Sequence, residues 1–484
     1  MEPIFELSLS HVEGRMTACR LIEELKAAIL DGRLAPGAQL PPTRRAQAMF
    51  RLSRNTVAGV YERLIHEGLA EARHGSGTFV AARRSAPKTR SAASVTFAVN
   101  PIWTDPATAS AMDFWSNPRL EGAASATDFR PALVDSRLFP LDILRRVVAR
   151  EMRRLETRPP SFKGPQGNQG SHRLRLGIAR HIAVTRSIAA DPSDVVVTAG
   201  AQQAFDLLAR VLVEPGRTVV AVEDPGYPPM RIPFQAAGAR LVAVPVDGEG
   251  MRVDLVPPEA GVICVCPSHQ FPLGVAMSAE RRAALVDYAR RRGALIVEDD
   301  YDGEFRHEGL PIAALRSAET ADVVAYVGTF SKCMLPSLRL GFLMAPEALR
   351  PAIVAARNAS DWHSPTPMQA GVAAFITDGH LARHVGRLRA LYGGRRRHLS
   401  QGLESLRDRL TVLPSAYGMH VAATVGDAEG LVRSEDACRR AGIQIHTLRR
   451  YGLATPTVDG IVLGIGAADE ADIDRLVGIL RDTL

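Results

Sequence analysis

The chain has 484 residues, of which 46% are hydrophobic and 23% charged, so we expect two or more folded domains and exclude a wholly disordered protein. The formal net charge of +7 at pH 7 is concentrated in residues 14–90, which hold 14 Lys and Arg against 6 Asp and Glu. A local basic excess of this kind is typical of a segment that meets phosphates.

The N-terminal segment 1–10 lacks the basic and apolar regions of a secretion signal, and the sequence contains no apolar run long enough to cross a membrane. The five cysteines form no CxxC pair and have no histidine at metal-ligand spacing. We therefore expect a cytoplasmic protein with reduced thiols, no disulfides and no metal site.

Residues 14–82 are predicted to form three helices followed by a β-hairpin. The apolar residues of 21–30 recur at helical spacing. A second, short helix is expected to start with Thr43 as its N-cap, and a third begins at Ser53. Two short extended runs within 69–80 are joined by a glycine-bearing turn, which is typical of a hairpin. This order of elements predicts a winged helix-turn-helix, an α+β domain.

The residues expected to face DNA lie at the starts of the second and third helices and at the hairpin tip. A recognition helix presents its N-terminal residues to base edges, while arginines and hydroxyls hold phosphates. Arg54 and Asn55 are chemically suited to guanine and adenine edges. For any single arginine a solvated surface is an adequate explanation, but it does not explain the ordered set. That set is Arg44, Arg45, Ser53, Arg54, Asn55, Thr56, His74, Gly75 and Gly77.

Residues 83–127 are rich in Ala, Ser, Thr and Pro and show little periodicity, which predicts an irregular interdomain linker. From 128 to 484, helical patterns alternate with short β-rich apolar runs. Such alternation is typical of an α/β domain with a mainly parallel sheet covered by helices. The predicted strands are 195–198, 218–222, 240–244, 261–266, 294–297 and 323–327.

A lysine motif follows the last of these strands: Thr329-Phe-Ser-Lys332, with Arg339 further along the chain. A lysine amine on a rigid element can form a Schiff base, and hydroxyls together with a guanidinium suit a dianionic phosphate. We assign the amine to Lys332, the hydroxyls to Thr329 and Ser331, and the guanidinium to Arg339. The cofactor that needs both features is pyridoxal 5'-phosphate.

Three further segments complete the predicted cofactor site. Asp299 follows a buried strand and can keep the pyridine nitrogen protonated, and Tyr301 can bond the ring 3'-oxygen. Residues 200–202 lie where a strand turns into a helix, whose backbone N–H groups bind phosphate. Tyr227 can stack on the ring, although singly it would be equally well explained as a packing residue. The full predicted set is Gly200, Ala201, Gln202, Tyr227, Asp299, Tyr301, Thr329, Ser331, Lys332 and Arg339.

These motifs resemble two known families. The runs 34–44, 53–57 and 75–80 resemble the GntR family of bacterial regulators, and the region from 128 onward resembles fold-type I aminotransferases. Over nearly its whole length the chain resembles MocR-type regulators, which combine the two. The resemblance implies a homodimer that binds operator DNA, carries pyridoxal 5'-phosphate as a Schiff base on Lys332 and responds to a small molecule.

Two positions depart from the aminotransferase pattern. Phe271 lies where those enzymes carry an asparagine that bonds the ring 3'-oxygen, and Val462 lies where they carry the arginine that clamps a substrate carboxylate. Both changes weaken the enzymatic interpretation, so we expect a half-reaction at most. Another arginine, Arg231, Arg449 or Arg450, could supply the clamp from a different direction.

Two main functions stay open at this point, beside a third in which the chain binds DNA without any cofactor. The first is a transcription regulator whose cofactor-loaded domain senses an amino compound or pyridoxal 5'-phosphate itself. The absent arginine at Val462 favours the cofactor, or an amine without a carboxylate. The second is an active aminotransferase with an accessory DNA-binding segment.

Overall fold

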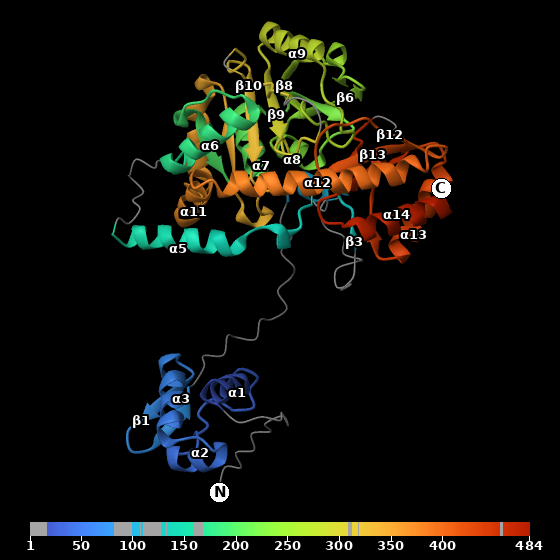
Figure 1. The fold of residues 1–484 in the computed structure, drawn as a ribbon. Coiled ribbons are helices and arrows are strands. Elements are labelled where there is room, and N and C mark those ends of the chain that lie inside the picture. The colour runs from blue at the N-terminus through green and yellow to red at the C-terminus, as the bar shows by residue number, and fades with distance from the viewer. Residues whose placement is uncertain are drawn as a thin grey trace. The chain divides into compact units, whose positions relative to one another are not determined.

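A computed structural model describes residues 17–81, 99–106, 108–109, 127–131, 133–157, 168–307, 312–317, 319–454 and 458–484. The chain divides into two compact units, Met1–Ala98 and Val99–Leu484, each of which is described by itself (Figure 1). Most of the predicted linker 83–127 lies outside the described residues, as do positions 14–16 and 82 of the predicted DNA-binding domain.

The first unit contains the predicted helices and hairpin. Its core is formed by apolar residues from one face of each helix together with the two strands, and includes Leu21, Leu25, Phe50, Val57 and Leu64. The order of elements confirms the winged helix-turn-helix. The elements are α1 (Ala18–Leu30), α2 (Thr43–Phe50), α3 (Arg54–His66), β1 (Ala70–Arg73) and β2 (Gly77–Val80).

The helix starts agree with the prediction in one case and not in the other. Ser53 is the N-cap of α3, and its Oγ accepts a hydrogen bond from the backbone N–H of Thr56 at 3.1 Å. The expectation for Thr43 is wrong, because Thr43 is the first residue of α2 and Pro42 occupies the cap position without a side-chain cap bond. The fixed φ of a proline directs the chain into the helix without such a bond.

Replacing Ser53 with alanine is expected to destabilise α3 by about 1 kcal/mol, because the cap hydrogen bond to Thr56 is lost. Hydrogen exchange measured by mass spectrometry on peptides of α3 should therefore be about fivefold faster at equal pH. Ser53→Asp is the matched control, since a carboxylate caps equally well. If Ser53→Ala leaves exchange in α3 unchanged, the cap contributes nothing to the stability of the helix.

The hairpin is extended by the chain that leads into α2. Three backbone hydrogen bonds of 2.8–2.9 Å join residues 37–40 to residues 78–80. The side chain of Gln39 also donates from Nε2 to the backbone oxygen of Ser76 at 2.7 Å. The wing is therefore hydrogen-bonded to the helical part of the unit on its β2 side.

The second unit is built around an eight-stranded sheet. Strands β5, β6, β8, β9 and β10 pair in parallel, β11 lies antiparallel between β10 and β4, and β7 lies antiparallel at the β6 edge. This arrangement confirms the mainly parallel sheet. In sheet order the strands are β4 (Val195–Thr198), β11 (Gly341–Met344), β10 (Val324–Thr329), β9 (Leu295–Asp300), β8 (Ala260–Val265), β5 (Val219–Asp224), β6 (Arg240–Asp247) and β7 (Gly250–Met251).

Helices surround this sheet, and the long helix α12 runs from the sheet region to the C-terminal elements, where it contacts α14 (Figure 1). Among the described helices, none combines the length and the apolar character needed to cross a membrane. The helices are α5 (Leu141–Thr157), α6 (His172–Arg186), α7 (Ala201–Leu212), α8 (Pro228–Ala236), α9 (Ala279–Arg292), α10 (Arg350–Asp361), α11 (Thr366–Thr377), α12 (His380–Glu404), α13 (Ala428–Arg440) and α14 (Glu470–Thr483).

The C-terminal part adds a four-stranded antiparallel sheet that the sequence patterns did not indicate. Its order is β12 (Leu410–Val412), β13 (His420–Val425), β16 (Gly460–Gly464) and β15 (His446–Thr447). The short strand β3 (Thr127–Asp128) pairs in parallel with β14 (Ile443–Gln444). Three of these six strands have only two residues, which is too short for a periodic pattern to reveal them.

The parallel strands end at a common edge of the large sheet, and the predicted motifs follow those ends. The segments after β5, β9 and β10 carry Tyr227, Tyr301 and Lys332 respectively. Ligands of open α/β sheets bind outside the carboxyl ends of the strands. The fold therefore gathers segments that are more than a hundred residues apart along the chain at one place.

Candidate functional site

A cavity of about 480 Å³ lies at this edge of the sheet. Nine of the ten predicted cofactor residues line it, and the tenth, Gly200, lies directly beside the guanidinium of Arg339. A Cβ at Gly200 would be 3.1 Å from Nη2 of Arg339, so the close approach favours glycine there. The lining residues are Leu133, Ala201, Gln202, Phe205, Tyr227, Pro229, Phe271, Asp299, Tyr301, Thr329, Ser331, Lys332, Pro336 and Arg339.

Lys332 stands in the wall of this cavity, just after β10. Burial lowers the pKa of its amine to about 8, although the carboxyl groups of Asp302 and Asp299 act in the opposite direction. A larger fraction of the amine is therefore neutral near pH 7 than for an exposed lysine. A neutral amine is the nucleophilic form, so Lys332 is suited to attack a carbonyl carbon.

Asp299 lies in β9, on another side of the cavity, and is almost fully buried. Its Oδ1 has no hydrogen-bond partner among the described residues. Burial, together with the neighbouring carboxyl groups of Asp300 and Asp302, raises the pKa of this carboxyl to about 8, although the amine of Lys332 acts in the opposite direction. A cationic group placed against the unpartnered oxygen would stabilise the anion of Asp299.

The opposite requirement, for an anion, is met near Arg339. Its Nη2 donates to the backbone oxygen of Ala199 at 2.8 Å, and the hydroxyls of Thr329 and Ser331 lie 2.9 Å apart. Helix α7 begins here with Gly200 as its N-cap, and no side chain in the described part of the chain caps its first N–H groups. Open N–H groups at a helix start, hydroxyls and a guanidinium together form a phosphate-binding arrangement.

Phe271 is the centre of an aromatic group at the cavity. Four rings approach it edge-on at centroid distances of 5.3–5.6 Å: Tyr227, Tyr301, His420 and Tyr451. Such T-shaped contacts are favourable because the positive edge of one ring meets the negative face of another. The ring of Phe271 packs in the cavity wall but has no hydrogen-bond donor to offer there.

Apolar packing surrounds Val462, the position that the resemblance to aminotransferases matches to their substrate-binding arginine. Val462 lies on β16, is fully buried and belongs to the core cluster that includes Phe271. None of the three alternative arginines, Arg231, Arg449 and Arg450, is among the residues that line the cavity. Within the described residues, Arg339 is therefore the single arginine of the cavity wall.

Sequence motifs missed some of the wall. Phe205 and Pro229 lie a few residues beyond predicted motifs, and Pro336 lies between Lys332 and Arg339. Leu133 comes from a segment about two hundred residues before the lysine, and a leucine carries no signal of chemistry. Only the fold brings these apolar residues to the cavity.

In the first unit, the candidate DNA-facing residues lie at three places on the surface. Arg44 and Arg45 are exposed on α2, Arg54 and Asn55 are exposed at the start of α3, and His74, Gly75 and Gly77 are exposed at the hairpin turn. The hydroxyls of Ser53 and Thr56 contact each other at 2.7 Å at the helix cap. Arg51, which the motifs did not indicate, is also exposed, in the turn between α2 and α3.

Comparisons with known proteins agree with this division. Residues 138–465 match the family described as aminotransferase class I and II, and residues 17–80 match the bacterial regulatory proteins of the gntR family. The chain is 33% identical to the probable rhizopine catabolism regulatory protein MocR of Rhizobium meliloti, over 96% of this chain and 92% of that protein.

Two further comparisons cover the whole chain and the larger unit. The chain is 29% identical to the HTH-type pyridoxine biosynthesis transcriptional regulator PdxR of Corynebacterium glutamicum, over 99% of this chain and 98% of that protein. The fold of an archaeal alanine:glyoxylate aminotransferase is similar, with a TM-score of 0.68 and 23% identity, over 77% of this chain and 96% of that one.

Proposed function

Because the chain belongs to the aminotransferase class I and II family and joins that region to a gntR-family DNA-binding domain, as MocR-type regulators do, we propose that it is a pyridoxal 5'-phosphate-dependent transcription regulator. One observation carries the proposal. A chain with an exposed helix-turn-helix surface also gathers Lys332, Asp299, Tyr301 and Arg339 around a single cavity.

The cavity residues fit this cofactor at both of its ends. Asp299 has a buried oxygen that lacks a partner among the described residues, and a protonated pyridine nitrogen would satisfy it. Arg339, the hydroxyls of Thr329 and Ser331, and the start of α7 would hold the phosphate. A volume of about 480 Å³ is in the usual range for a small-molecule site.

The cofactor, when bound, supplies an aldehyde carbon that reacts with amines and a ring that withdraws electrons. Lys332 would provide the amine that holds it covalently, and the lowered pKa of this amine favours the neutral, reactive form. Asp299 would keep the ring nitrogen protonated, while Tyr301 would donate a hydrogen bond to the ring oxygen. The ring of Tyr227, fixed edge-on against Phe271, forms part of the surface on which the cofactor ring lies.

The effector follows from what the cavity offers. An α-amino acid needs a partner for its carboxylate, but Val462 is buried and the single arginine of the described wall lies at the phosphate end. The effector is therefore pyridoxal 5'-phosphate itself or an amine without a carboxylate. Regulation requires that this ligand bind one arrangement of the protein more tightly than another. The working form is a cytoplasmic homodimer that joins the nucleoid when it binds its operator.

Footprinting on the chain's own promoter region tests this function. We expect a protected site whose affinity changes when pyridoxal 5'-phosphate or a non-carboxylated amine is added. The same preparation, given an amino-acid panel with 2-oxoglutarate, should show no sustained turnover, because the carboxylate clamp is absent. Sustained turnover without any protected DNA would favour the active aminotransferase, whose lysine, aspartate and phosphate-binding residues this cavity also contains.

A further inference from the structure

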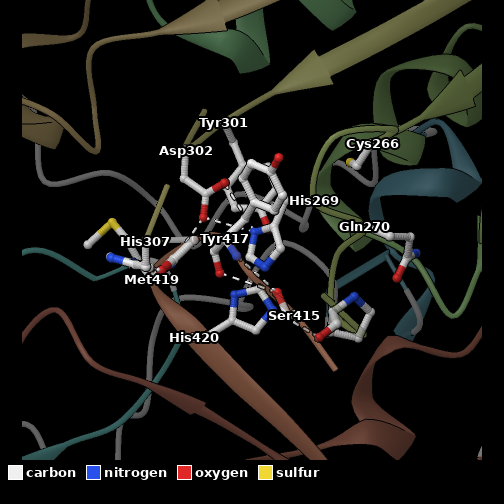
Figure 2. A network of polar contacts seen from close by, with 12 residues as sticks. Cys266, His269, Gln270, Tyr301, Asp302, His307, Ser415, Tyr417, Met419 and His420 are labelled. Atoms are coloured by element: carbon white, nitrogen blue, oxygen red, sulfur yellow. Dashed lines mark hydrogen bonds and ion pairs between the residues drawn. The ribbon is translucent and has the colours of Figure 1, made fainter. Parts of the chain in front are cut away.

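Behind Tyr301 lies a buried polar cluster that no sequence motif assigned (Figure 2). It consists of His269 after β8, Asp302 after β9 and His420 at the start of β13. Each side chain is at most 4% exposed, and potential metal-binding atoms of the three lie within 4.8 Å of one another. A buried group of this polarity needs a reason, because burying polar atoms costs free energy unless they are hydrogen-bonded.

The contacts of the cluster converge on one nitrogen. His269 Nδ1 lies 2.7 Å from the hydroxyl of Tyr301 and 3.1 Å from each carboxylate oxygen of Asp302. Figure 2 shows Tyr301 and Asp302 both directed at the ring of His269. Asp302 Oδ2 also accepts the backbone N–H of Met419 at 3.1 Å. An imidazole nitrogen carries either a proton or a lone pair, so Nδ1 is either a hydrogen-bond donor or an acceptor toward Tyr301 and Asp302, but not both.

The charge state of Asp302 determines whether Nδ1 of His269 carries the proton. Burial raises the pKa of Asp302, but the charge of His269 and hydrogen bonds from His269 and Met419 outweigh burial, and the pKa lies below its usual value. An ionised Asp302 can only accept, so the proton shared with it belongs to Nδ1 of His269. A protonated Nδ1 has no lone pair left with which to accept a hydrogen bond from Tyr301. The oxygen of Tyr301 is therefore the acceptor in its contact with His269.

The protonation of His269 determines where the hydroxyl of Tyr301 can donate its proton. Burial raises the pKa of Tyr301 well above its usual range, so the hydroxyl keeps its proton. Because the proton cannot be given to Nδ1, it is available to an acceptor in the cavity that Tyr301 lines. Resting on the proposed function, we propose that His269, held by Asp302, is a positioning residue that directs the Tyr301 hydroxyl to donate to the cofactor's ring oxygen.

The surroundings hold the ring of His269 in this orientation. His420 packs against it at a centroid distance of 4.6 Å, and its own Nε2 contacts the backbone oxygen of Pro272 at 2.9 Å. Gly418, at φ +80°, leaves the space that the ring occupies, because a Cβ there would be 1.9 Å from Cε1 of His269. His269 therefore has little freedom to turn Nδ1 away from Tyr301.

Phe271 makes this positioning consequential. It supplies no donor at the place where aminotransferases have an asparagine, so the ring oxygen would depend more strongly on the hydroxyl of Tyr301. Phe271 also contacts Tyr301 edge-on at 5.6 Å, which restricts the tyrosine ring but not the direction of its proton. His269 contributes that direction.

The test uses four variants of the full-length protein and the visible absorbance of the bound cofactor as a function of pH. A donor to the ring oxygen stabilises its anionic form, so losing the donor raises the apparent pKa of the absorbance change by about one unit. We expect this rise for Tyr301→Phe and for His269→Gln, whose amide cannot occupy the Nδ1 position. His269→Asn places an N–H there and should restore the wild-type value to within about 0.3 units. The apparent pKa of Asp302→Asn should lie between that of the wild type and that of His269→Gln.

The pH profile has to be interpreted with the other charged groups of the region. Those that influence Tyr301 or His269, or that line the same cavity, are Glu223, Cys266, Asp299, Asp302, His307, Lys332, Arg339 and His420. None of them is altered in the matched pair His269→Gln and His269→Asn. A difference between these two variants is therefore assigned to the N–H at the Nδ1 position.

Several outcomes would overturn the inference. Equal shifts in His269→Gln and His269→Asn would mean that His269 acts by packing alone, and an unshifted Tyr301→Phe would mean that Tyr301 does not donate to the ring. Stoichiometric metal in the purified protein, with a spectrum altered by a chelator, would make the cluster a metal site instead. ¹⁵N spectra of histidine-labelled protein show whether Nδ1 of His269 is protonated, and they do so without any cofactor. They distinguish a failed inference from a protein that binds no pyridoxal 5'-phosphate.

Discussion

Lys332→Ala is expected to remove covalent attachment of pyridoxal 5'-phosphate completely. The amine of Lys332 lies in the cavity wall with its pKa lowered to about 8, and alanine has no group that can replace it. The variant should lack the visible absorbance band of the wild type. After borohydride reduction, mass spectrometry should find the wild-type label on the peptide that contains Lys332 and no label in the variant.

The chain makes this experiment unusually clear, because it has four lysines among its 59 basic residues: Lys26, Lys88, Lys163 and Lys332. Lys26→Ala is the matched control, since Lys26 forms an ion pair with Glu67 in the first unit. Label on any of the other three lysines in the wild type would contradict the assignment. The core of the first unit does not include Lys332, so Lys332→Ala should still bind DNA but lose its response to the ligand.

Arg54→Ala is expected to weaken binding to the operator by about 5- to 150-fold. The residue is exposed at the start of α3, where a recognition helix meets base edges, and a bidentate contact to a base contributes about 1–3 kcal/mol. Titration of labelled operator and of unrelated DNA, each at several salt concentrations, measures the effect. Specific binding should fall more than non-specific binding.

Two other arginines separate base contacts from phosphate contacts. Arg63→Ala is the control, because Arg63 lies on the same helix but at its far end, where it pairs with Glu67 at 3.2 Å. Arg44→Ala should weaken binding to all sequences alike and reduce the slope of affinity against salt by about one. If Arg54→Ala behaves like Arg44→Ala, then Arg54 contacts the backbone of the DNA and reads no base.

The first unit was predictable from sequence because local signals determine each of its elements. Helical spacing of apolar residues, the Ser53 cap and the glycine-bearing hairpin turn all act over a few residues. The start of α2 was predicted wrongly because Thr43 has the chemistry of a cap but follows Pro42. Conformational restriction by the proline outweighed side-chain preference there.

Most strands of the large sheet were predictable from their apolar runs, including β6, which is only partly buried. Strands β5, β8, β9 and β10 lie within the parallel part of the sheet, with fully buried residues along most of their length, and each was expected from its apolar run. Strand β11 was missed although its four residues are apolar and buried, as are those of the antiparallel neighbour β4 that was predicted. The second sheet was missed in part because two of its four strands, β12 and β15, have only three and two residues.

The chemistry of the cavity was predictable because it depends on rare residue types after strand ends, such as Lys332 and Asp299. The cluster behind Tyr301 was not, although His269 lies within a segment that resembles the family. Its meaning depends on Asp302 and His420, which reach it from different elements. No spacing along the chain encodes that convergence.

Because residues 37–40 are hydrogen-bonded to the hairpin, they belong to the smallest segment that could transfer DNA-binding specificity between related proteins. Because backbone bonds join this segment to residues 78–80, and Gln39 holds the turn at Ser76, the wing shares its framework with the chain ahead of α2. In a chimera that takes only the hairpin from a related protein, the backbone N–H and C=O groups of residues 37–40 would have to pair with a β2 strand of different sequence. Transferring residues 37–80 as one segment keeps all of these bonds, so the recipient protein should acquire the operator preference of the donor protein.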